Sequence, residues 1–80
     1  MKSETLKEVY NGLNDSRFLE AKHGDHLHVL DKALGEYFVF STQIEKEVYH
    51  VNESEIPWNL LDGLTWVEKR KGVVDVRVTS

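Results

Sequence analysis

With 80 residues, no cysteine and a formal net charge of −4, the chain has room for one small domain. The lack of cysteine excludes a disulfide framework and a thiolate metal site. The acidic balance argues against a protein that coats nucleic acid through a general basic field. Because 40% of the residues are hydrophobic and 30% charged, we expect a globular single domain over residues 1–80.

The first predicted element is a short helix near the N-terminus. Ser3 is a favourable N-cap residue, and Glu4 suits the first turn of a helix. The apolar positions that follow have helical spacing: Leu6, Val9, Tyr10 and Leu13. Asn11-Gly12 and Asn14-Asp15 are typical of a helix end and would end this helix after about three turns.

Alternating residues predict a first β-hairpin between residues 17 and 31. If His23-Gly24-Asp25 form a three-residue loop, Glu20 pairs with His28 across the ladder. One face then collects the apolar side chains Leu19, Ala21, Leu27 and Val29, and the other holds Glu20, Lys22, His26 and His28. A two-residue loop would mix these faces, so the alternation favours the longer loop.

A second hairpin is predicted from residues 37–42 and 47–51, joined through a turn at 43–46. Pairing Phe40 with Tyr49 and Phe38 with Val51 would build one aromatic and β-branched face. Between the two hairpins, residues 31–35 are expected to form a turn or a single helical turn.

The third predicted hairpin has Arg70-Lys71-Gly72 as its loop and pairs Trp66 with Val76. Gly72 would supply the left-handed conformation that the third loop position requires. Before this hairpin, residues 54–61 suit a short capped helix, or an extended lead-in followed by one turn, which Asp62-Gly63 ends.

These elements predict an α+β fold. An N-terminal helix packs on an antiparallel meander sheet of five to six short strands, with a short helix before the C-terminal hairpin. A small, partly closed β-barrel is the alternative. No apolar run approaches membrane-spanning length, and the first residues lack the apolar core of a signal peptide. We therefore expect a soluble, cytoplasmic protein without a membrane partner.

Three of the four histidines, His23, His26 and His28, lie within six residues of one another. His26 and His28 point the same way on a strand, and Glu20 across the predicted ladder would add an oxygen ligand. Together they form a candidate divalent-metal site, although Lys22 beside His26 would repel a cation. A solvated polar face explains the same residues, so metal binding is an alternative function, and we expect no cofactor.

The main basic cluster is Lys69, Arg70 and Lys71 at the predicted third hairpin tip, with Arg77 on the neighbouring strand. These side chains could contact a phosphate backbone while Trp58 or Trp66 stacks on a base. Acidic residues elsewhere would repel nucleic acid. Nucleic-acid contact through this tip is therefore a second alternative rather than the expected function.

No catalytic motif is present in the sequence. There is no glycine-rich phosphate loop, no GxSxG elbow and no cysteine nucleophile. A chain of this length also offers little volume for a pocket that excludes water. We expect the protein not to be an enzyme.

Protein binding is the expected function. Eight aromatic residues are many for so small a core, and aromatic side chains on a polar rim are typical of interface hot spots. The predicted protein-binding residues are Tyr37, Glu45, Glu47, Glu53, Glu55, Trp58 and Asp62. The acidic stretch would complement a basic partner surface. Small acidic domains of this kind are typical of bacterial or phage regulators, adaptors or inhibitors.

A terminal strand at residues 73–78 would leave an exposed sheet edge. Asp75 and Arg77 are charges of the kind that block pairing at such an edge. We therefore expect a monomer or a weak homodimer.

Overall fold

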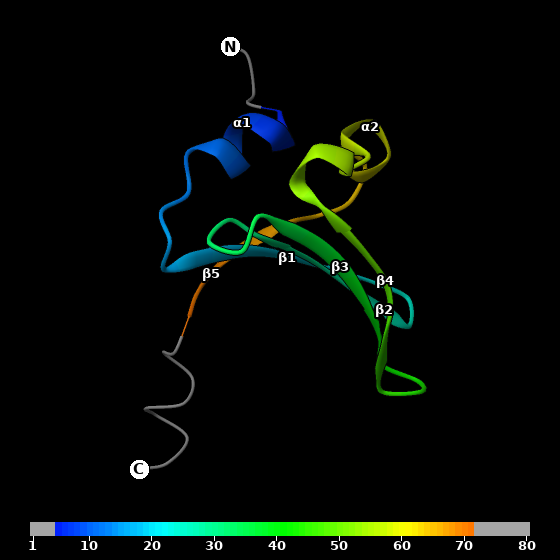
Figure 1. Cartoon of the computed structure of the whole chain (residues 1–80). Coiled ribbons are helices and arrows are strands. Elements are labelled where there is room, and N and C mark those ends of the chain that lie inside the picture. The colour runs from blue at the N-terminus through cyan, green and yellow to red at the C-terminus, as the bar shows by residue number, and fades with distance from the viewer. Residues whose placement is uncertain (1–4, 72–80) are drawn as a thin grey trace.

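Within residues 5–71, which this computed structural model describes, five antiparallel strands form one open sheet with two α-helices on one side (Figure 1). In chain order the elements are α1 (Leu6–Asn11), β1 (Arg17–His23), β2 (His26–Asp31), β3 (Glu36–Ser41), β4 (Lys46–Asn52), the 3-10 helix η1 (Glu53–Glu55), α2 (Trp58–Leu61) and β5 (Val67–Arg70). The strand order is β4-β3-β2-β1-β5, so β4 and β5 are the edges of the described sheet. The predicted α+β meander is confirmed, and the sheet is open rather than closed into the alternative barrel.

Helix α1 begins after Thr5, so the prediction of Ser3 as its N-cap is wrong. The Thr5 hydroxyl accepts a hydrogen bond from the Glu8 backbone N–H at 3.3 Å. The Glu8 carboxylate in turn accepts one from the Thr5 N–H at 3.1 Å. This capping box satisfies N–H groups that a helix start otherwise leaves unpaired. The helix ends at the first of the two predicted positions, with Gly12 as the C-cap residue, so its six residues make it shorter than the three turns predicted.

The turn between β1 and β2 has two residues, Gly24-Asp25, so the predicted three-residue loop is wrong. Gly24 has a φ of 60°, and Asp25 is not among the described residues with positive φ. This combination matches a type II′ turn, in which glycine takes the first central position. As a result Glu20 pairs with Val29 instead of His28. Relative to β1, this shift of one residue places the side chains of β2 on the opposite face from the one predicted.

The register between β3 and β4 also differs from the prediction. The observed pairs include Tyr37 with Val51, Phe38 with His50, Val39 with Tyr49, and Phe40 with Glu47. An irregularity between Val39 and Phe40 shifts the ladder locally. The phenylalanines of β3 are therefore not paired with Tyr49 and Val51, and the predicted aromatic and β-branched face does not form.

The segment after β4 matches the second predicted form only in part, because it begins with a 3-10 helix in place of an extended lead-in before its one helical turn. It comprises η1, an extended Ile56 and then α2, which ends at the C-cap Asp62 as predicted. Strand β5 pairs with β1, with Arg70 opposite Arg17. Gly72 and the predicted strand at residues 73–78 lie outside the described residues.

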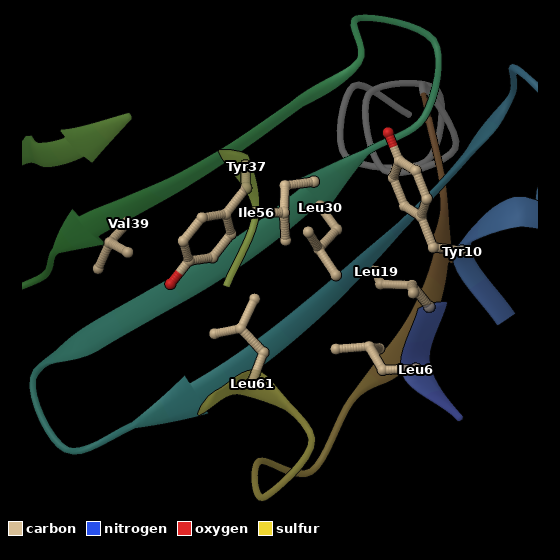
Figure 2. Close-up of a cluster of buried hydrophobic side chains, with 8 residues drawn as sticks. All are labelled: Leu6, Tyr10, Leu19, Leu30, Tyr37, Val39, Ile56 and Leu61. Atoms are coloured by element: carbon tan, nitrogen blue, oxygen red, sulfur yellow. The ribbon is translucent and has the colours of Figure 1, made fainter. Parts of the chain in front are cut away.

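The core lies between the sheet and the helical segments (Figure 2). Its buried members are Leu6, Tyr10, Leu19, Leu30, Tyr37, Val39, Ile56 and Leu61. Burying each large apolar side chain stabilises the fold by roughly 1.5–3 kcal/mol. The predicted apolar stripe of α1 is confirmed, because Leu6 and Tyr10 are buried and Val9 and Leu13 pack against the cluster. In the part of the chain that the structure describes, no helix is long and apolar enough to cross a membrane.

Candidate functional site

All three phenylalanines of the chain lie on the sheet face that the α-helices leave uncovered (Figure 1). Side chains alternate along a strand. Because Leu19, Leu30, Tyr37 and Val39 point into the core, their strand neighbours point to the other side (Figure 2). We call this side the open face and define it by its apolar side chains Phe18, Leu27, Val29, Phe38 and Phe40. All of them except Val29 are only partly buried.

The centre of the open face is a block of four apolar side chains on two adjacent strands. Leu27 pairs with Phe40, and Val29 pairs with Phe38, across the β2–β3 ladder. Cross-strand pairs of this kind contribute roughly 0.2–1 kcal/mol each, so the block also supports the sheet. The block nevertheless remains partly in contact with solvent, because neither described α-helix packs over it.

Charged side chains surround this apolar block. Ion pairs join Lys69 to Glu20 at 3.0 Å, Lys71 to Asp31 at 2.8 Å, and His50 to Glu36 at 3.2 Å, the last requiring a protonated histidine. Partly exposed pairs of this kind contribute little to stability. An apolar centre with a polar rim is, however, the usual anatomy of a protein–protein interface.

The opposite side of the sheet holds a cavity of about 360 Å³. We call it the aromatic cavity; its lining residues are His23, His28, Tyr37, Val39, Tyr49, Pro57, Leu60, Leu61 and Leu64. The first five come from β1 to β4, and the last four from the α2 region. Leu60 is 78% exposed and Tyr49 47% exposed, so the cavity has an apolar rim.

His28 and Tyr37 form the polar part of the aromatic cavity. The His28 Nδ1 lies 2.9 Å from the Tyr37 hydroxyl, and the two rings stack at 6.2 Å between centroids. Burial lowers the pKa of His28, and the nearby His23 and His26 lower it further. Burial also raises the pKa of Tyr37, with a smaller contribution from Tyr49. Both shifts favour a neutral, hydrogen-bonded pair near neutral pH.

The structure does not bring the predicted protein-binding residues together. Glu45 precedes the seven-residue strand β4 and Glu53 follows it, so the two lie roughly 20 Å apart. Glu47 is exposed and pairs with Phe40, which places it at the rim of the open face. Glu55 is exposed in η1.

Four members of the predicted set have structural contacts. Tyr37 is only 3% exposed and belongs to the core, so its predicted place on the surface is wrong. Trp58 packs against Tyr10 with 5.3 Å between ring centroids. The Asp62 carboxylate accepts a hydrogen bond from the Leu6 backbone N–H at 3.1 Å, and Glu53 accepts one from the Tyr10 hydroxyl at 3.3 Å.

Two of the four candidate nucleic-acid residues are paired with acids. The ammonium groups of Lys69 and Lys71 bind Glu20 and Asp31, as described above. Arg70 is exposed on β5, and Arg77 lies outside the described residues. The paired lysines present less net positive charge to a phosphate backbone than the sequence indicates.

The predicted metal site loses its oxygen ligand. In the observed register Glu20 lies on the open face, whereas His26 and His28 share the other face with the buried Ala21. Among residues 5–71 no group of three potential ligands is arranged to hold a metal ion.

Sequence reasoning missed both the open face and the aromatic cavity, and one signal could have found them. Gly24-Asp25 is itself a recognised two-residue hairpin turn. Choosing this turn would have set the register that puts the histidines on the helix side.

Neither a scan against protein-family models nor searches of curated proteins and of solved structures found a match to this chain.

Proposed function

We propose that this chain is a non-catalytic module that binds another protein through the open face. The observation that supports this most is the partly exposed apolar block of Leu27, Val29, Phe38 and Phe40, surrounded by ion pairs, on the side of the sheet that the two described α-helices leave uncovered. Contiguous apolar patches with polar rims mark interaction sites on soluble proteins. A sheet that is apolar on both faces is stable in water when a further layer covers the second face.

The charges at the rim indicate what the partner presents. Glu36 and Glu47 lie at the β4 side of the open face, whereas Lys69 and Lys71 at the β5 side are paired with Glu20 and Asp31. A complementary partner carries an apolar strip with basic side chains at the end that meets β4. Such complementarity mainly speeds association and fixes orientation, while the phenylalanine rings supply affinity.

This proposal keeps the predicted class of partner and changes the predicted surface. Glu47 is the member of the predicted set at the rim of the open face. Tyr37 contributes from the core side, where it holds β3 against the helices. The contact surface therefore centres on β2 and β3 rather than on residues 45–62.

The test is affinity capture from an extract of the source organism, with three forms of the full chain as bait. In the first variant, Phe38→Thr/Phe40→Thr, threonine keeps a strand-favouring side chain while removing both rings. The matched control is Leu34→Thr/Ile44→Thr, because these side chains are 61% and 59% exposed and lie in turns at the ends of β3. Circular dichroism of all three forms confirms that the fold is kept.

We expect the wild type and the control to capture the same partner. The phenylalanine variant should capture at least about tenfold less of it, since hot-spot truncations cost about 2 kcal/mol or more. Sedimentation of the purified protein at several concentrations provides a second readout. A dimer that the phenylalanine variant abolishes would make a second copy the occupant, in place of another protein. Identical capture by all three forms would contradict the proposal.

A further inference from the structure

The aromatic cavity is a second site, separate from the open face, because its lining residues Tyr37, Val39 and Leu61 belong to the core side of the sheet (Figure 2). Three aromatic rings line it in contact with one another. His28 stacks on Tyr37, and Tyr37 meets Tyr49 edge to face at 5.9 Å between centroids. Leu60 and Leu61 from α2 form an aliphatic wall. Its volume of about 360 Å³ falls within the range of small-molecule pockets, roughly 300–1,000 Å³.

The polar side chains that line the aromatic cavity are histidine and tyrosine groups, each of which can donate a hydrogen bond. Its ionisable lining residues are His23, His28, Tyr37 and Tyr49, and no carboxylate is among the described lining residues. When the Tyr37 hydroxyl donates to the His28 Nδ1, the neutral imidazole keeps its hydrogen on Nε2 and can donate in turn. A ligand that suits these groups supplies acceptor atoms.

A second hollow shows the opposite character. It has a volume of about 400 Å³, lies beside α1, and includes the carboxylates of Asp62 and Glu68 in its lining. An anion would be repelled there, whereas the aromatic cavity has His23 and His28 in its lining and no carboxylate among its described lining residues. The charge pattern therefore distinguishes the two hollows.

We propose that the aromatic cavity binds a small carboxylate anion with an aromatic or branched aliphatic body. The body packs between Tyr49 and the leucines of α2, where offset or edge-to-face ring contacts are favourable. The carboxylate accepts hydrogen bonds from the His28 Nε2–H and the Tyr49 hydroxyl, because the Tyr37 hydroxyl already donates to His28. Bonds to an ionised acceptor are stronger than neutral ones. This site does not depend on the open face.

Benzoate is the probe, and benzamide is its neutral, nearly isosteric control. Both are titrated into the ¹⁵N-labelled full chain at pH 6.5, above the isoelectric point of about 5.5. We expect benzoate to bind with a dissociation constant on the order of 1 mM, as a fragment-sized ligand does. Chemical-shift changes should centre on His28, Tyr49 and Leu61, and benzamide should bind about tenfold more weakly.

Two histidine variants complete the test. His28→Phe keeps an aromatic ring but removes the ring nitrogens, so it should remove most of the preference for benzoate over benzamide. His50→Phe is the matched control, since His50 pairs with Phe38 on the open face, and it should bind benzoate as the wild type does.

Equal binding of benzoate and benzamide, or shifts confined to the basic residues 69–71, would overturn the proposal. So would an unchanged benzoate preference in a folded His28→Phe variant. Failure to bind the probe at tens of millimolar would have the same meaning. None of these results bears on the open face, whose test uses a protein partner.

Discussion

Replacing Gly24 with alanine should destabilise the protein by about 1–2 kcal/mol, because a β-carbon is disfavoured in the left-handed region. Gly24 has a φ of 60°, and no heavy atom lies within 4 Å of the place where its β-carbon would be. The cost is therefore backbone strain without a steric clash. A loss of this size lowers the folded-to-unfolded ratio roughly 5- to 30-fold, which is a large change for a domain this small.

Gly63→Ala is the matched control. Its β-carbon also meets nothing within 4 Å, but Gly63 does not have the positive φ found at Gly24. Alanine there should stabilise the protein by about 0.4–1 kcal/mol, because it restricts the unfolded chain without straining the folded one. A β-carbon has open space at both sites, so the opposite signs report on the difference in backbone φ.

Asp25→Gly tests the register directly. Asp25 does not have a positive φ, so glycine should cost about 0.4–1 kcal/mol through the entropy of the unfolded chain. A three-residue loop would instead hold Asp25 in the left-handed region, and glycine would then stabilise the protein. Urea denaturation followed by the fluorescence of Trp58 and Trp66 measures all three variants by linear extrapolation. A stabilising Asp25→Gly with a neutral Gly24→Ala would refute the observed register and move the histidines to the open face.

Three further predictions concern the core and its titrating groups. Leu30→Ala should cost about 2–5 kcal/mol in urea denaturation, since Leu30 is 0% exposed. Burial and Glu53 raise the pKa of Tyr10 from 10.0 to about 12, so the folded protein resists an ionisation that the unfolded chain allows. Stability should therefore be lost as the pH rises from 10 towards 12, and Tyr10→Phe should remove much of this loss in urea titrations at each pH. Because the pKa of His28 is lowered, the unfolded chain takes up a proton more readily, and stability should fall as the pH drops below about 6.5. His28→Phe should flatten that acid limb in the same assay.

The positions of the elements along the chain could be predicted because local signals determine them. Asn11-Gly12 ends α1, the turn at residues 32–35 separates the two hairpins, and Asp62 ends α2. Each of these depends on residues within one turn of the boundary. The predicted N-cap failed for a related reason, because Ser3 and Thr5 are both suitable caps and only Thr5 has a glutamate at the third helical position to complete a capping box.

The face of the sheet that enters the core could not be predicted from alternation. Strand β3 reads Tyr37-Phe38-Val39-Phe40, which is apolar at every position. Such a strand offers two apolar faces, and a slip of one residue exchanges them. The choice depends on where α1 and α2 lie, and their contacts with Leu19 and Leu30 span long sequence separations.

The candidate site was hard to predict for the same reason. Charged residues outside strands are usually exposed to solvent. The sequence therefore indicated that Glu53 and Asp62 were free to contact a partner. In the fold both accept hydrogen bonds from α1, one from the Tyr10 hydroxyl and one from the Leu6 backbone. Internal contacts of this kind pair residues about 40 to 56 positions apart, which no local pattern indicates.

The two proposed sites share strands β1, β2 and β3 but no side chain. Phe38 and Phe40 belong to the open face, whereas Tyr37 and Val39 line the aromatic cavity. Two ligands are coupled when a structural element has two conformations and each ligand favours one of them. Side chains on opposite faces of a pleated strand do not by themselves form such an element. We therefore expect Phe38→Thr/Phe40→Thr to bind benzoate within about twofold of the wild type, since independent sites are additive within roughly 0.3–0.5 kcal/mol.

The benzoate titration of this variant also reports on the protein partner. Coupling free energies are reciprocal. If benzoate changed the affinity of the protein for its partner, the partner would change the affinity for benzoate by the same factor. A change much larger than twofold on removing the two rings would show that the β3 backbone transmits packing from one face to the other. The aromatic cavity would then regulate the open face, and benzoate should change partner capture by the wild type. An unchanged benzoate affinity would instead establish two independent sites on one sheet.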